Sequence, residues 1–121
     1  MKPHVERPQP SAEYATPERC RILESWNVAS DPEVSIARAR VAPGVTTAAH
    51  RLSGVTERYV IIEGRGRVAI GTGLMQDVVP GDVVIIPAGV TQHITNTGTT
   101  DLVFYCICTP RFTQDCYEAL E

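Results

Sequence analysis

Two stretches decide the fold of this chain: GVTTAAHRLSGVTERYVIIEG at residues 44–64 and GDVVIIPAGVTQHITN at residues 81–96. Each combines β-branched runs with glycines at positions where a strand must turn. Side chains alternate between the two faces of an extended strand, so His50 and Leu52 are expected to share one face. A carboxylate follows at Glu57. The first stretch therefore offers an imidazole and a carboxylate as candidate site residues on strands.

The two stretches resemble the paired motifs of the cupin family. The matching positions are Gly44, His50, Glu57 and Gly64 in the first stretch and Gly81, Pro87, Gly89 and Asn96 in the second. Leu52 stands where the family has the second histidine of a His-x-His pair, and Gln92 stands where it has a third. The resemblance implies an all-β fold, namely a cupin-type jelly-roll, double-sheet β-barrel with a short C-terminal helix or turn.

A complete cupin site offers three imidazoles and a carboxylate, a set that suits iron, manganese, nickel, copper or zinc. Carried over to this chain, the resemblance implies one divalent transition metal held by His50, Glu57 and Gln92. The set is degenerate because two imidazoles are missing. Each residue also has a plainer interpretation: His50 as a hydrogen-bonded buried histidine, Glu57 as half of an ion pair, and Gln92 as a hydrogen-bond donor to substrate or a bridge between strands.

His93 is the alternative metal ligand. A β-bulge near Gly89 would shift the strand by one residue and turn His93 inward in place of Gln92. Asn96 would then fall at the wrong spacing, so the unbulged register is favoured.

Further strands are predicted outside the two motifs, separated by turns that contain glycine or proline. They cover residues 21–26, 34–41, 59–62, 67–70 and 102–108, and a helix has room only at 113–120. The run VVII at 83–86 lacks polar alternation, which indicates a strand covered on both faces. In a chain of one domain the second cover is a second subunit. We therefore expect a homodimer, with Ile22, Leu23 and Trp26 in its interface.

Length and charge bound the remaining questions. The 121 residues suffice for one domain, and four of the nine prolines lie in the first 17 residues. We expect a flexible or strapped arm at residues 1–14 and a single cupin barrel at 15–121. With 11 basic and 14 acidic residues and no basic cluster, nucleic acid is not an expected partner. The polar N-terminus indicates neither a signal peptide nor a membrane span, so a cytoplasmic location is expected.

The substrate pocket is assigned to Leu52, Tyr59, Asn96 and Arg111. Arg111 either recognises a carboxylate at the mouth of the barrel or pairs with a surface acid. Cys106 and Cys108 lie two apart on one strand and face the same way. They are expected to be core residues, and a soft-metal site is the weaker alternative.

Two functions from different classes follow. In one, the chain is a metal-dependent enzyme, similar to a dioxygenase, isomerase or lyase, that acts on a small organic acid. In the other, the metal site has decayed, and the barrel is a small-molecule-binding or purely structural module. The sequence leaves open whether the protein is an enzyme.

Overall fold

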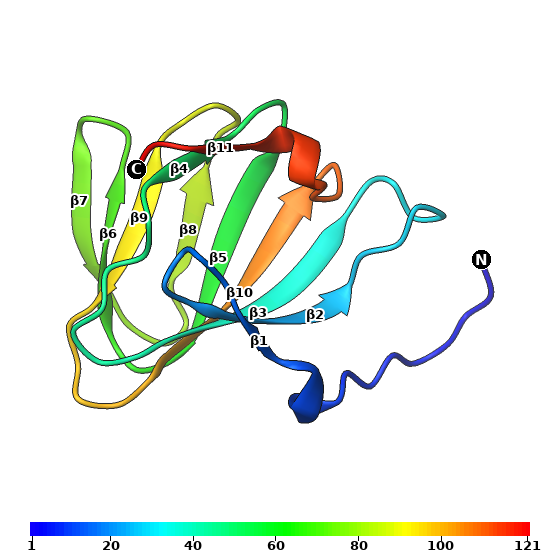
Figure 1. The fold of residues 1–121 in the computed structure, drawn as a ribbon, viewed down its shortest axis with the longest axis horizontal. Helices are drawn as coiled ribbons and strands as arrows, with labels where there is room; N and C mark the ends of the chain where they lie inside the picture. The colour runs from blue at the N-terminus through cyan, green and yellow to red at the C-terminus, as the bar shows by residue number, and fades with distance from the viewer.

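The computed structural model describes all 121 residues as two antiparallel sheets packed face to face (Figure 1). The six-stranded sheet has the order β1-β2-β3-β10-β5-β8 and the five-stranded sheet the order β11-β4-β9-β6-β7. The strands of the first are β1 (Tyr14–Ala15), β2 (Arg21–Trp26), β3 (Ser35–Val41), β10 (Leu102–Thr109), β5 (Thr56–Glu63) and β8 (Val83–Ile86). Those of the second are β11 (Tyr117–Ala119), β4 (His50–Leu52), β9 (Gln92–Asn96), β6 (Gly66–Ile70) and β7 (Leu74–Val78).

The expected all-β, double-sheet architecture is confirmed. Helical structure is limited to two three-residue 3-10 turns, η1 (Pro10–Ala12) and η2 (Gln114–Cys116). The C-terminal segment is thus a turn followed by a strand, because Cys116 is buried and Tyr117–Ala119 pairs with β4. None of these helical segments has the length and apolar character needed to cross a membrane.

The hydrophobic core fills one end of the space between the sheets. Its side chains alternate inward from both sheets, and its least exposed members are Val41, Ile61, Val68, Ile86, Ile94 and Leu102. Burying one side chain of this size stabilises the fold by about 1.5–3 kcal/mol. Toward the other end β3 turns only Ser35, Ala37 and Ala39 inward, and these small side chains leave the sheets apart.

Asn96 lies within the core as a connector between loops. Its side chain is 1% exposed and donates to the carbonyls of Val41 at 2.9 Å and Thr100 at 2.8 Å. Its carbonyl oxygen accepts from the amide of Gly98 at 2.9 Å. The predicted pocket role does not fit this geometry, because all three contacts are internal. Through these hydrogen bonds Asn96 joins the turn after β9 to the end of β3.

The outer face of β8 is not covered within one chain, and its cover by a second subunit stays a prediction. In β8, Val84 and Ile86 are buried, whereas Val83 is 55% and Ile85 is 56% exposed. Of the three expected interface residues, Ile22 lines the cavity between the sheets and Leu23 is only 4% exposed within a single chain, whereas Trp26 is partly exposed.

The segment before β1 crosses the outer face of β2 and β3. Glu13 binds the guanidinium groups of Arg21 at 2.9 Å, Arg38 at 3.3 Å and Arg40 at 3.2 Å. Further out, the ring of His4 packs against Trp26 with centroids 5.1 Å apart. Figure 1 shows the course of this segment from the N-terminus to η1 and β1.

We predict that Asn96→Ala lowers the free energy of unfolding by about 2–3 kcal/mol, because it leaves buried backbone groups without partners. The melting temperature should fall on the order of 10 °C in a thermal scan. The matched control is Thr97→Ala at the exposed neighbour, which should melt like the wild type. Equal melting temperatures for both variants would show that the three hydrogen bonds of Asn96 do not stabilise the fold.

Candidate functional site

A cavity of about 580 Å³ lies between the sheets, where the small side chains of β3 leave the space unfilled. Strands β2, β3, β5 and β10 form one wall, and β4 with the C-terminal segment forms the other. The turn between β1 and β2 lines its rim. A volume of this size is ordinary for a small-molecule site.

His50 enters the cavity from β4 with one ring nitrogen already engaged. Its Nδ1 lies 2.9 Å from the carbonyl of Ala48 and 3.4 Å from the carboxylate of Glu18, and its ring stacks on Tyr117 at 5.0 Å. A carbonyl only accepts, so Nδ1 carries a proton and donates it. In the neutral imidazole the lone pair is then on Nε2, which has no protein partner.

Glu57 faces His50 from the opposite sheet. It lines the cavity from β5, is 7% exposed, and its Oε1 is buried without a hydrogen-bond partner. Burial raises the pKa of this carboxyl, while the proximity of His50, Gln92 and Cys106 offsets part of the effect. Such surroundings favour the uncharged acid form of Glu57.

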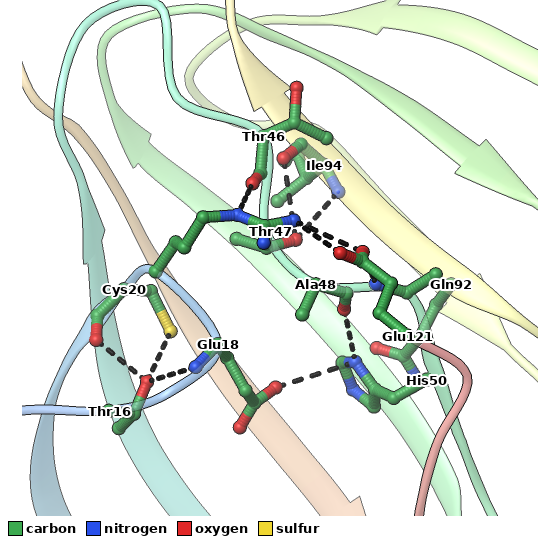
Figure 2. Close-up of polar contacts among 12 residues, drawn as sticks. Thr16, Glu18, Cys20, Thr46, Thr47, Ala48, His50, Gln92, Ile94 and Glu121 are labelled. Atoms are coloured by element: carbon green, nitrogen blue, oxygen red, sulfur yellow. Dashed lines mark hydrogen bonds and ion pairs between the residues drawn. The ribbon is translucent and has the colours of Figure 1, made fainter.

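Glu18 belongs to the site although it lies outside both motifs. It sits on the turn between β1 and β2, where its carbonyl accepts from the amide of Ala48 at 3.0 Å. This contact places its carboxylate beside Nδ1 of His50 (Figure 2). Burial raises the pKa of Glu18, and His50 opposes that shift. No local sequence signal marks the residue, because its position depends on a turn folded over a distant strand.

Arg19 links the turn between β1 and β2 to the C-terminal residue Glu121. Its Nε donates to the carbonyl of Thr46 at 2.8 Å, and its Nη2 donates to the carboxylate oxygens of Glu121 at 3.0 and 3.1 Å. Its φ of 66° is in the left-handed region, which is uncommon for a residue with a side chain. The contacts join three segments that are far apart in sequence at the rim of the cavity.

The second motif has the unbulged register. Gln92 is 1% exposed, and its Oε1 accepts from the hydroxyl of Tyr59. His93 lies on the other strand face and is partly exposed. Leu52 and Tyr59 line the cavity, as the pocket assignment expected, whereas Arg111 does not.

Three of the four free cysteines line the cavity. Burial raises the pKa of Cys20 to about 11 and raises that of Cys106 well above its usual range. The pKa of Cys108 is raised by the same cause. The three therefore act as neutral, small cavity walls, because only the thiolate is a strong nucleophile or metal ligand.

The residues present do not fit a transition-metal centre. No three His, Cys, Asp or Glu side chains converge in a metal-binding arrangement. Such sites use three or four protein ligands. Here His50 and Glu57 are two, Leu52 occupies the position of a third, and the oxygen of Gln92 is engaged by Tyr59.

These features define a small all-β barrel that is closed at one end by its core and hollow at the other. Residues 37–108 match the family model described as a cupin domain, and the chain belongs to the cupin family. This confirms the resemblance seen in the motifs.

Relatives in sequence include an uncharacterized protein, MJ1618, from Methanocaldococcus jannaschii. It is 31% identical over 101 residues, which cover 84% of this chain and 80% of that protein. The oxalate-binding protein of Thermotoga maritima is 35% identical over 71 residues, covering 59% of this chain and 58% of that one.

Solved structures show the same fold at low identity. An uncharacterized protein with a double-stranded β-helix domain from Klebsiella pneumoniae has a TM-score of 0.76 at 15% identity, covering 92% of both chains. Pac13, a nucleoside dehydratase, has a TM-score of 0.78 at 12% identity, covering 98% of this chain and 92% of that one. At these identities the likeness concerns the fold alone.

We predict that Glu57→Gln stabilises the protein increasingly as the pH rises. The pKa of Glu57 is raised in the folded state. The stabilisation that this group contributes to the folded chain is therefore fully present below the ordinary pKa of 4.5, and it is lost as the pH rises through the pKa of the folded state. Each tenfold difference in proton affinity between the folded and unfolded chains corresponds to about 1.4 kcal/mol. Glutamine cannot ionise and avoids this loss.

The measurement is the melting temperature of both proteins between acidic and neutral pH. The gap between variant and wild type should widen by several degrees as the pH increases. Glu118→Gln is the control, since Glu118 is exposed and paired with Arg51 outside the cavity. A gap that stays constant with pH would mean that Glu57 ionises as readily in the folded chain as in the unfolded one.

Proposed function

We propose that the cavity binds a small organic molecule and catalyses a metal-independent proton transfer of the lyase or isomerase class. His50 is the general base and Glu57 the general acid. The observation that carries this proposal is the pairing of an unpartnered, buried carboxyl with an imidazole whose free nitrogen is Nε2, on opposite walls of one cavity.

The base is oriented by its contacts. Nδ1 donates to the carbonyl of Ala48, which fixes the ring and its tautomer, the carboxylate of Glu18 lies 3.4 Å from the same nitrogen, and Tyr117 packs on the ring face. The negative charge of Glu18 also stabilises the imidazolium that forms when Nε2 takes a proton. Glu18 is thus a positioning residue.

The acid is prepared by desolvation. Burial raises the pKa of Glu57, which keeps its proton at a pH where an exposed carboxyl has lost it. Its Oε1 has no protein partner, so a polar atom of a ligand can take that place. Acid and base face one another across the space in which the ligand lies.

An elimination illustrates the chemistry. Nε2 of His50 takes a proton from the carbon next to a hydroxyl-bearing carbon, and the electron pair of that C–H bond forms a double bond. The C–O bond breaks, and Glu57 gives its proton to the departing hydroxyl, which leaves as water. Return of the proton from His50 to Glu57 through solvent restores both groups. In an isomerisation the proton returns to another carbon of the ligand instead.

The comparisons support a ligand-binding barrel of this kind. One structural neighbour is a nucleoside dehydratase, and a sequence relative is an oxalate-binding protein. Among the functions expected from the sequence, the donor set favours the isomerase-like and lyase-like ones, since oxygen chemistry would need a redox centre. The non-enzymatic binding module is the alternative proposal.

The proposal is tested by incubating the protein in D₂O with a library of hydroxylated small molecules and recording mass spectra. We expect at least one compound to gain deuterium or lose water. Because each variant removes a proton-transfer group, His50→Gln and Glu57→Gln should slow the reaction by about 10²–10⁴-fold. Glu118→Gln serves as the control and should match the wild type.

Two results would decide against metal-independent catalysis. If a chelator abolishes turnover and a divalent metal restores it, the metal-dependent hypothesis is correct instead. Binding without turnover of any compound would favour the binding module.

We also propose that the protein forms a homodimer through the outer face of β5 and β8. Ile62 is 42%, Val83 55% and Ile85 56% exposed on this face. The register places Val83 beside Val60, which extends the apolar surface onto β5, whereas Ile85 lies beside Arg58 at the border of this surface. A contiguous exposed apolar strip of this kind is typical of an interface between subunits.

We predict a dimer in multi-angle light scattering at micromolar concentration, with a buried area of about 1,000 Å² or more. Val83→Glu combined with Ile85→Glu should give a monomer, because it places charges in an apolar interface. Met75→Glu is the control: Met75 is 69% exposed on β7, in the other sheet. A monomeric wild type would refute this assembly.

A further inference from the structure

We propose that the cavity selects organic cations, and that its ligand carries an ammonium group. This inference rests on the proposed function only in that the cavity is the ligand site. It differs from the anionic ligand that the name of the oxalate-binding relative gives for that protein, and it replaces the small organic acid expected from the sequence.

The charges that line the cavity are predominantly negative. Four carboxyl groups line it, those of Glu18, Glu24, Glu57 and Glu121, against one guanidinium, that of Arg19. Arg19 already pairs with both oxygens of Glu121. The chain has a single lysine, Lys2, and it does not line this cavity.

Of the other three, Glu57 keeps its proton in the proposed mechanism and is neutral, so the unpaired acidic groups that can carry charge are Glu18 and Glu24. Glu18 has only His50 as an ionic neighbour, at 3.4 Å, and Glu24 has no ion pair. Burial raises the pKa of both groups, although Glu24 is exposed on its solvent side. An anionic ligand would meet repulsion here, whereas an ammonium group would supply the missing partner.

A second and independent observation points to a ligand. Glu57 is more than nine-tenths buried, lines the same cavity, and leaves Oε1 without a partner. Buried polar atoms are satisfied in almost all folded proteins, so an exception inside a cavity marks a position for a ligand atom. A ligand hydroxyl at this position would leave the proton of Glu57 available for transfer.

The walls also suit an ammonium group. Rings of Tyr14, Tyr59, Phe104, Phe112 and Tyr117 line the cavity. The face of an aromatic ring attracts a cation, and the attraction is strongest where water is excluded. Aromatic rings combined with carboxylates are therefore a matched lining for organic ammonium compounds.

The sheet register connects the charged rim to the reactive groups. Glu24 pairs with Ala37, Ala37 with Cys106, and Cys106 with Tyr59, so the four lie in one cross-strand row. Glu24 is exposed at one end of this row, and Tyr59 is buried at the other. A ligand lying over the small side chains of Ala37 and Cys106 would place its ammonium near Glu24 and its other end near Glu57, the residue that pairs with Cys108 beside this row.

The test uses three probes of similar shape: phenethylammonium, phenethyl alcohol and hydrocinnamate. Their affinities are measured by calorimetric or NMR titration at neutral pH and low ionic strength. We expect the cation to bind about tenfold more tightly than the alcohol, and the carboxylate to bind most weakly. The preference should shrink as salt is added.

Glu24→Gln removes one rim charge without touching the proton-transfer groups. It should reduce the preference for the cation several-fold and leave the affinity for the alcohol unchanged. Glu118→Gln removes a charge outside the cavity and should change neither. Ala37→Phe fills the cavity and should abolish binding of all three probes.

The outcomes separate the two proposals. If the alcohol binds, Ala37→Phe abolishes its binding, and the cation has no higher affinity than the alcohol, then the cavity is a ligand site but the proposed charge selectivity is wrong. A carboxylate that binds as tightly as the cation overturns the inference in the same way. If none of the probes binds, both the selectivity and the ligand role of the cavity are overturned.

Discussion

The site depends on an uneven filling of the space between the two sheets. Isoleucine, leucine and valine side chains from both sheets close one end, whereas β3 contributes only serine and alanine toward the other. The well-packed end holds the strands in register, and the open end provides a cavity with rigid walls. His50 and Glu57 line opposite walls of this cavity, because each is fixed on a strand of a different sheet.

Desolvation then determines the chemistry of the carboxyl groups. Glu57 is buried with an oxygen that has no hydrogen-bond partner, and the only ion pair of Glu18 is with His50. Such groups are costly for stability, and a chain that keeps them in a cavity gains in exchange a proton donor and an oriented base. The same unpaired charges set the sign of the ligand that the cavity favours. The proposed catalysis and the proposed selectivity both rest on the shortage of cations around the carboxyls that line the cavity.

Strand alternation was sufficient to predict much of this structure. It placed His50 with Leu52 on an inward face and separated Gln92 from His93. Sequence reasoning could not find Glu18 and Arg19, because the turn that carries them is positioned by Ala48, Thr46 and Glu121, residues distant in the chain. Strand β7 was not predicted because its first four residues are exposed and do not alternate between polar and apolar, so that only pairing with β6 makes it a strand. Asn96 carried the family spacing but not the expected role, since spacing does not reveal whether an amide meets a ligand or a loop.

The protonation state of Glu57 tests the proposed chemistry most directly. Infrared difference spectra between wild type and Glu57→Gln, recorded on metal-free protein across a pH series, report the carboxyl stretch of this single group. We predict a protonated carboxyl band that persists well above the ordinary pKa of 4.5. A carboxylate band already complete near that pH would show that Glu57 is ionised in the cavity, and its role as a proton donor would be contradicted.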